Sequence, residues 1–206
     1  MRLILAALIS VVLFGQAATV NGVANQTVSI PSLLSSAAVS TAQVTITTAA
    51  TDFKLAEISL AAGYLNTANK VIAVSASGTW TTVALQTPAW TFKVKLCTVS
   101  GCGSGTALTL LSWVSAAATA STTQTWIIES SIGTSATGAS GTTISHGFAD
   151  LPVGATGNKA FTGLHDANTA VSGSIDLTAA LFLDITVQSS TGLLNTAVSH
   201  TAKIIQ

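Results

Sequence analysis

The sequence predicts an all-β protein that folds as a single antiparallel sandwich or barrel. From about Thr51 onward, short runs rich in β-branched and aromatic residues alternate between apolar and polar positions. Clusters of Gly, Asn and Ser separate these runs at about the 8–12-residue spacing that is typical of sandwiches and barrels. Convincing helical spacing over ten or more residues is absent beyond the N-terminal segment, apart from a doubtful Ala-rich stretch at 115–120. Because 206 residues can bury the core of one ordinary domain, we expect one β-domain.

The individual strands follow from the same pattern. The run Trp90–Leu96 places apolar residues on one face and Thr91, Lys93 and Lys95 on the other, which indicates a strand that is buried on one side. The full set of expected strands is Lys54–Leu60, Lys70–Ser77, Trp90–Cys97, Ala107–Val114, Thr123–Ile132, Thr142–Ala149, Ser172–Leu177, Phe182–Gln188 and Ser199–Ile205.

Residues 1–20 form a hydrophobic N-terminal segment. Arg2 precedes an apolar run from Leu3 to Phe14, and small residues stand three and one before a cleavage point after Ala17. This pattern is typical of a secretory signal peptide. The run is shorter than the about 20 residues that a membrane span needs, so the remaining alternative is a retained apolar anchor or a helix buried between subunits.

Residues 21–50 are rich in Ser, Thr and Ala and contain Pro31. Only weak strand patterns occur there, such as Val44–Thr48. We expect an extended arm at 21–50, followed by the sandwich at 51–206. Because such an arm would lose much conformational entropy on ordering alone, we expect it to lie across a neighbouring subunit.

The composition excludes one class of partner and favours another. Charged residues make up 7% of the chain, hydrophobic residues 49%, and seven basic residues balance seven acidic ones. The lysines are scattered along the sequence, so no basic stripe is available for nucleic acid. A neutral, weakly charged surface has little self-repulsion, which favours self-association. We therefore expect a homo-oligomer.

Cys97 and Cys102 flank a glycine-containing connection between two expected strands. A hairpin would bring them close enough for a disulfide. Two free buried thiols are the main alternative, and a metal site is the weakest, because the sequence has no second cysteine pair to complete a tetrahedral set.

Catalytic residues and cofactors are not expected. The histidines are His146, His165 and His200, and His146 and His165 lie near Asp150 and Asp166 in the sequence. Neighbours in sequence on a strand point to opposite faces, and no Gly-x-Ser-x-Gly elbow accompanies the abundant serines. We interpret the histidines as structural.

Two further features have simple structural explanations. The glycine-rich stretches 101–105 and 133–141 lack the strand-to-helix setting of a phosphate loop and are typical of hairpin turns. The four tryptophans lie in alternating strands, which favours core or interface packing over a sugar-binding face. They are Trp80, Trp90, Trp113 and Trp126.

The order of these segments resembles the jelly-roll structural proteins of tailed-bacteriophage virions over about residues 51–206. The segments that carry the resemblance are Lys54-Leu-Ala-Glu-Ile-Ser-Leu, Ala62-Gly63, Asn69-Lys-Val-Ile-Ala-Val-Ser-Ala-Ser-Gly-Thr-Trp80, Trp90-Thr-Phe-Lys-Val-Lys-Leu, Trp126-Ile-Ile-Glu129, Gly141-Thr-Thr-Ile-Ser-His-Gly-Phe148, Ser174-Ile-Asp-Leu-Thr-Ala-Ala, Leu183-Asp-Ile-Thr-Val-Gln188 and a closing strand at Ser199–Ile205. The resemblance implies a double-sheet jelly roll at a decoration, tail or fibre position, often as a trimer.

The expected function is a non-enzymatic structural component of a phage virion, either a capsid decoration or a tail-associated protein. Its partners would be further copies of the chain, with a trimer favoured, and other virion proteins, without nucleic acid or a small-molecule substrate. The signal-like N-terminus departs from the virion pattern and supports an alternative, a secreted bacterial surface or matrix adhesion protein. Glycan binding stays open at this point.

Overall fold

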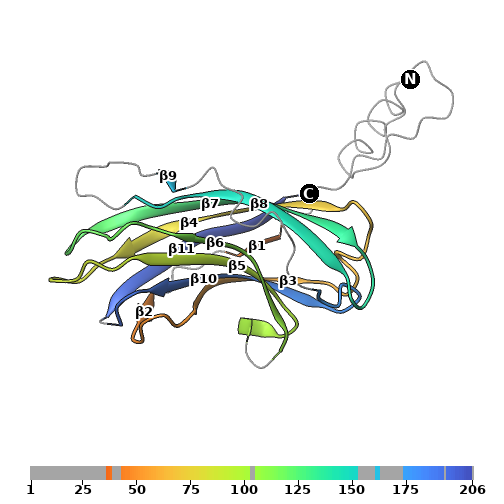
Figure 1. Cartoon of the computed structure of the whole chain (residues 1–206), viewed down its shortest axis with the longest axis horizontal. Helices are drawn as coiled ribbons and strands as arrows, with labels where there is room; N and C mark the ends of the chain where they lie inside the picture. Colours follow the sequence, from red (N-terminus) through yellow and green to blue (C-terminus); the bar gives the residue numbers. More distant parts are fainter. Residues whose placement is uncertain are drawn as a thin grey trace, which may run out of the picture. The chain divides into compact units, whose positions relative to one another are not determined.

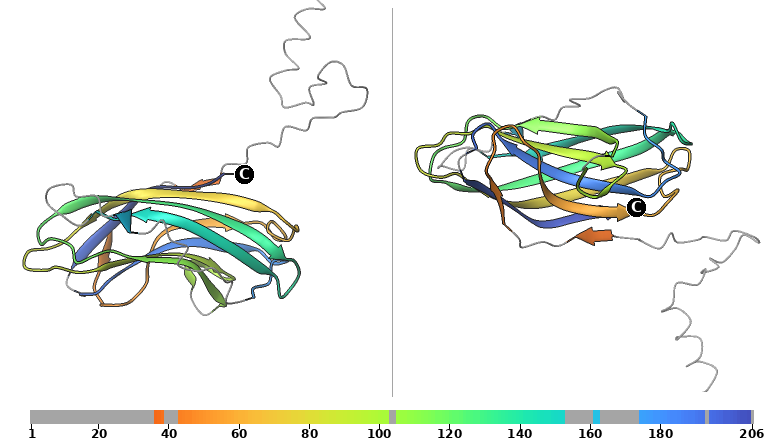
Figure 2. Two further views of the ribbon diagram at one scale, coloured as in Figure 1. Left: turned by 45° about the horizontal axis from the view of Figure 1, so that its top comes forward. Right: turned by 90° about the horizontal axis from the view of Figure 1, so that it is seen from below.

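The protein is an all-β sandwich of two antiparallel sheets (Figures 1 and 2). The computed structural model describes residues 36–38, 43–102, 105–152, 161–162, 174–192 and 194–205, all within one compact unit, Ser35–Ile205. Across these residues the only helical element is the short 3-10 turn η2 (Ser100–Cys102). None of the described helical structure is long and apolar enough to cross a membrane. The expected N-terminal segment at 1–20 lies outside the described residues.

The two sheets differ in size. The order of the larger sheet is β1-β11-β4-β7-β8-β9, with β2 also paired to β11; its strands are β1 (Ser36–Ala38), β2 (Val44–Ile46), β4 (Val71–Thr81), β7 (Thr123–Ala136), β8 (Thr142–Asp150), β9 (Phe161–Thr162) and β11 (Asn195–Ile205). The order of the smaller sheet is β3-β10-β5-β6; its strands are β3 (Phe53–Leu60), β10 (Leu181–Ser189), β5 (Trp90–Cys97) and β6 (Ala107–Val114).

The strand pairs are nested along the chain. β5 pairs with β6, and β4 pairs with β7 outside them in the sequence. β3 then pairs with β10, β2 pairs with the beginning of β11, and β1 pairs with its end as the outermost pair. The chain therefore follows the path of one long antiparallel hairpin that doubles over into two layers, with β8 and β9 inserted between β7 and β10.

An aromatic layer fills the space between the sheets. Trp80 and Trp126 come from the larger sheet, and Trp90 and Phe92 come from the smaller one. The ring centroids of Trp80 and Trp90 are 4.8 Å apart, and those of Phe92 and Trp126 are 5.0 Å apart. These four side chains are fully buried, as is almost all of Trp113. The core interpretation of the tryptophans is confirmed, and they offer no sugar-stacking face.

Most of the expected strands are present. Trp90–Cys97 and Ala107–Val114 have the bounds that the sequence predicts, and several others run a few residues longer. The expected strand Ser172–Leu177 is wrong for its described residues 174–177, where one isolated bridge joins Ile175 to Gly141. The short strands β1 and β9 were not expected, because two or three residues carry no measurable period.

The described part of the expected arm pairs within its own chain. Ser36 and Ala38 are opposite Ile204 and Ala202 of β11, and β2 pairs with the beginning of the same strand. This portion therefore gains backbone hydrogen bonds by folding back on its own chain.

Asn195, the first residue of β11, joins two chain connections at one end of the sandwich. Its side chain is fully buried. Its Oδ1 accepts a hydrogen bond from the backbone N–H of Val83 at 3.2 Å, and its Nδ2 donates to the hydroxyls of Ser189 and Thr191 at 3.2 and 3.0 Å. One amide thus satisfies polar groups from the connection after β4 and from the β10–β11 turn.

We expect Asn195→Ala to lower the free energy of unfolding by about 1–3 kcal/mol, because the Val83 N–H and the Ser189 hydroxyl lose their partner in a buried setting. Urea unfolding followed by tryptophan fluorescence measures the change. Thr125→Ala, at an exposed position of β7, is the control and should change the value by less than about 0.5 kcal/mol. Equal effects of the two substitutions would contradict the role given to Asn195.

Candidate functional site

Charged side chains gather on the outer face of the smaller sheet. Three of the chain's seven basic and three of its seven acidic residues lie there, and we call this group the charged face: Asp52, Lys54, Glu57, Lys93, Lys95 and Asp184. The register sets Glu57 of β3, Asp184 of β10 and Lys95 of β5 side by side in one row. Strand pairing thus brings together three lysines that are scattered along the sequence, and acids lie beside them on this face.

Asp52 holds the two lysines of β5. Its carboxylate accepts from Lys93 Nζ at 3.0 Å and also pairs with Lys95 Nζ. Burial raises the pKa of Asp52, but the hydrogen bonds and positive charges of Lys95 and Lys93 outweigh it and leave the pKa below its ordinary value. Asp52 is therefore ionised at neutral pH and fully engaged.

Glu57 fastens the turn between β5 and β6 to the sheet. Its carboxylate accepts hydrogen bonds from the Ser100 hydroxyl at 2.8 and 2.9 Å, from the Gly101 N–H at 2.7 Å and from Lys54 Nζ at 3.1 Å. Gly101 adopts φ 66°, a conformation that suits glycine. Burial raises the pKa of Glu57, and these hydrogen bonds more than offset it, so the pKa lies below its ordinary value.

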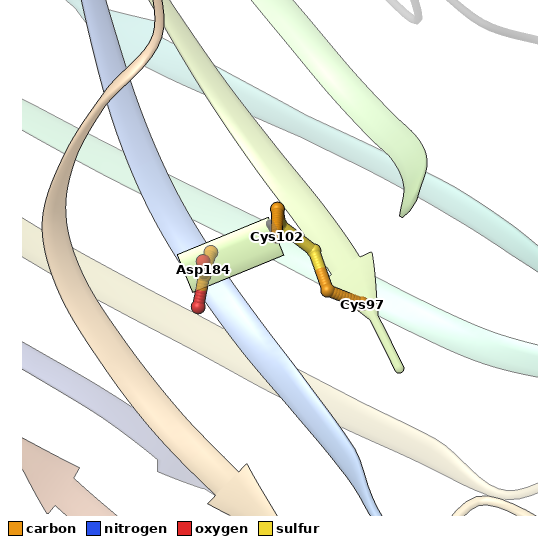
Figure 3. A group of neighbouring side chains, drawn as sticks. All are labelled: Cys97, Cys102 and Asp184. Carbon is orange, nitrogen blue, oxygen red and sulfur yellow. A yellow bond between two sulfur atoms is a disulfide. The ribbon is translucent and has the colours of Figure 1, made fainter. Parts of the chain in front are cut away.

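A disulfide closes the same turn. Cys97 is the last residue of β5 and Cys102 is the last of η2, and they are bonded with their Cα atoms 5.2 Å apart (Figure 3). That separation lies within the range that a disulfide requires. Cys97 is fully buried, whereas Cys102 is partly exposed. Of the arrangements that the sequence left open, the structure contains the disulfide.

Asp184 lies beneath this turn, next to the disulfide (Figure 3). Its neighbours Leu183 and Ile185 point into the core, so Asp184 points to the charged face, yet it has no exposed surface. No hydrogen-bond donor reaches either of its carboxylate oxygens. Its pKa is raised to about 6, mainly by burial and next by the negative charge of Glu57, and the positive charges of Lys54 and Lys95 only partly oppose this shift. The sequence did not single out Asp184. It lies in the apolar run 181–187, and the residues next to it in the sequence do not show which side chains of the neighbouring strands lie beside it.

The other candidate residues from the sequence do not assemble into a site in the described structure. His146 is exposed on β8, and Asp150 is four residues further along the same strand, about 13 Å away at strand spacing. His165 and Asp166 lie outside the described residues, and of His200 only the backbone, in β11, is described. The glycine-rich stretch 133–141 includes the turn from β7 to β8, where Gly138 has φ 101°, so the turn interpretation is confirmed there.

Comparison of the chain with protein-family models, with curated proteins and with solved structures gives no match. The resemblance to phage jelly-roll proteins therefore stays a hypothesis, which is based on strand order and composition.

We expect Asp184→Asn to make the protein more stable at pH 7. Asp184 has its pKa raised from an ordinary 3.8 to about 6, so between these values the folded chain keeps a proton that the unfolded chain has lost. The free energy of unfolding of the wild type should therefore fall as pH rises through this window and stay lower above it. The neutral amide avoids this loss, so the advantage of the variant should grow by about 3 kcal/mol between pH 4 and pH 7. Urea unfolding at a series of pH values measures it.

Asp176→Asn serves as the control, and its effect should have the opposite sign. Hydrogen bonds from the Thr178 side chain and backbone hold the pKa of Asp176 below its ordinary value, so this carboxylate stabilises the fold above that value and loses its effect as pH falls. An Asp184→Asn variant that is less stable than the wild type at pH 7 would contradict the assignment.

We expect Glu57→Ala to speed reduction of the Cys97–Cys102 disulfide by at least about tenfold, because losing hydrogen bonds to a charged acceptor costs roughly 1.5–3 kcal/mol and lets the turn open. Timed alkylation after addition of a dithiol reductant measures the rate. Glu129→Ala removes an acid that accepts from Ser75 on the other sheet, and it should leave the rate unchanged. Equal rates in all three proteins would show that Glu57 does not hold the turn.

Proposed function

We propose that the chain is a non-enzymatic structural protein that acts by homo-oligomeric assembly as a component of a phage virion, in a capsid-decoration or tail-associated position. The nested strand pairs support a jelly roll as the form of the sandwich. A jelly roll consists of two Greek keys in a double sheet, the path that a long hairpin takes when it curls into two layers. In this proposal β2–β7, β10 and β11 are the eight strands of the roll, and β8 and β9 are an insertion.

In this proposal, copies of the chain contact one another through the outer face of the larger sheet. Among the side chains that the structure describes, four exposed apolar ones stand on it: Val71, Ile127, Ile144 and Phe148. Val71 and Ile144 are 57% and 55% exposed, and the register places Gly133 between them. Because Gly133 has no side chain, the two apolar groups flank a flat strip of backbone. We call Val71, Gly133 and Ile144 the apolar strip.

The surroundings of the apolar strip favour a second copy of this chain as its occupant. Hydroxyl side chains cover much of the rest of β4 and β7 on this face, for example Ser75, Ser77, Thr123 and Thr125. Small hydroxyl groups allow close approach and cost less to desolvate than charges. The net charge of zero also gives two copies little mutual repulsion. A trimer is the favoured number by resemblance alone, and other virion proteins would complete the particle.

The disulfide supports a second candidate function, that of a secreted protein. Disulfides persist in oxidising surroundings such as the periplasm and the extracellular space. A secreted bacterial surface or matrix adhesion protein with a cleaved signal peptide would meet that condition. The intact mass of native material separates the two candidates: loss of residues 1–17 supports secretion, and Met1 retained in a particle supports the virion component.

We expect Ile144→Lys to shift the full-length protein toward monomer in sedimentation velocity at micromolar concentration, because each copy would bring a charge into the shared interface. Val114→Lys is the matched control, since Val114 is equally exposed, at 55%, but lies on β6 of the smaller sheet. It should leave the oligomer unchanged. A wild type that is monomeric throughout would refute the assembly proposal, and equal effects of both substitutions would remove the apolar strip from it.

A further inference from the structure

Three side chains with metal-ligating atoms converge at the disulfide. One ligand atom from each of Cys97, Cys102 and Asp184 lies within 4.8 Å of the other two (Figure 3). They come from three elements, the end of β5, the turn η2 and the middle of β10. The register fixes β5 against β10 by pairing Cys97 with Phe182 and Lys95 with Asp184, so Asp184 is the diagonal neighbour of Cys97.

The carboxylate of Asp184 points to an additional binding partner. It is fully buried, and neither of its oxygens receives a hydrogen bond. A buried carboxylate without a donor is costly unless a proton or a cation offsets its charge. The lysines Lys93 and Lys95 are already paired with Asp52, and Lys54 is paired with Glu57. Of the three acids on the charged face, Asp184 is therefore the one whose carboxylate has neither a hydrogen-bond donor nor an ion-pair partner.

We propose that reduction of the disulfide creates a binding site for a thiophilic divalent cation of the Zn²⁺ class, formed by the thiolates of Cys97 and Cys102 and the carboxylate of Asp184. Two sulfur ligands and one carboxylate suit Zn²⁺ or Cd²⁺, and do not suit Ca²⁺ or Mg²⁺, which take oxygen ligands. The partly exposed side of Cys102 leaves a fourth position to water.

The geometry requires only a small adjustment once the S–S bond is open. A tetrahedral site with bond lengths of about 2.0–2.3 Å places its ligand atoms about 3.3–3.8 Å apart. The three ligand atoms already lie within 4.8 Å of one another, and Cys102 ends the short turn η2 rather than standing inside a strand. Glu57 is not needed as a ligand, because its oxygens hold Ser100, Gly101 and Lys54.

The disulfide and the metal site exclude each other. Cation binding displaces one proton from each thiol, and the proton of Asp184 where it is present. Oxidation by a low-molecular-weight disulfide removes two electrons from the two thiolates, forms the Cys97–Cys102 bond and releases the cation. The oxidant takes up the two electrons and two protons and leaves as two thiols. The site would therefore hold metal only under reducing conditions.

Titration of the reduced full-length protein with Co²⁺ under nitrogen, after removal of a phosphine reductant, tests the proposal. The expected result is a thiolate-to-cobalt charge-transfer band in the near ultraviolet with tetrahedral bands in the visible, all of which added Zn²⁺ abolishes. The oxidised protein should give none of these bands. Asp184→Asn should weaken Co²⁺ binding by at least about tenfold, since even the outer-shell partners of a metal site contribute that much. Asp176→Asn changes a partly exposed acid outside this group and should leave the affinity unchanged.

Four results would overturn the proposal. They are the absence of charge-transfer bands in the reduced protein, equal bands in the oxidised protein, an unchanged affinity in Asp184→Asn, and a reduced chain that has lost its β signal. Far-UV circular dichroism accompanies each titration to measure that signal. Cys102→Ser, on the partly exposed turn, is the second variant. It should lose most of the charge-transfer intensity while it keeps the sandwich.

Discussion

The aromatic layer between the sheets is the packing constraint on which the other features depend. Trp90 and Phe92 of β5 must point inward to meet Trp80 and Trp126 of the opposite sheet. Since side chains alternate along a strand, the same condition turns Lys93 and Lys95 outward. The charged face is thus a consequence of core packing. Its lysines then fix Asp52 and, through the row across β10, set the electrostatic surroundings of Asp184.

The distribution of charge gives the two outer faces different properties. A chain with so few charged residues places a large share of them on the smaller sheet, where acids and bases neutralise one another locally. The outer face of the larger sheet carries the apolar strip, many hydroxyl groups and few charges, among them Glu129 and Lys203. The first face has ionisable groups near the disulfide, and the second is the one that we propose for contact with another copy of the chain. The outer faces of the two sheets therefore differ in their chemistry, although the chain as a whole has few charges.

The alternation of apolar and polar residues accounts for the features that could be predicted from the sequence. Strands β5 and β6 were predicted with their observed bounds because eight-residue alternation is a strong signal, and Cys97 and Cys102 were placed together because a hairpin was expected between them. Alternation says nothing about which strands pair, so the grouping of Glu57 with Asp184 and Lys95 could not be foreseen. The error at residues 174–177 has a similar cause, since a short apolar pattern fits a bridge as well as a strand.

The nested order of the strands also has a consequence for how the chain folds. Pairing β2 directly with β11 would close a very long loop at a large entropic cost. If β5 and β6 pair first, β4 and β7 meet across a loop that is already closed, and each later pair benefits in the same way. We therefore expect the sandwich to zip from its innermost hairpin outward. The covalent link between Cys97 and Cys102 lies at that innermost turn, where this sequence of events would begin.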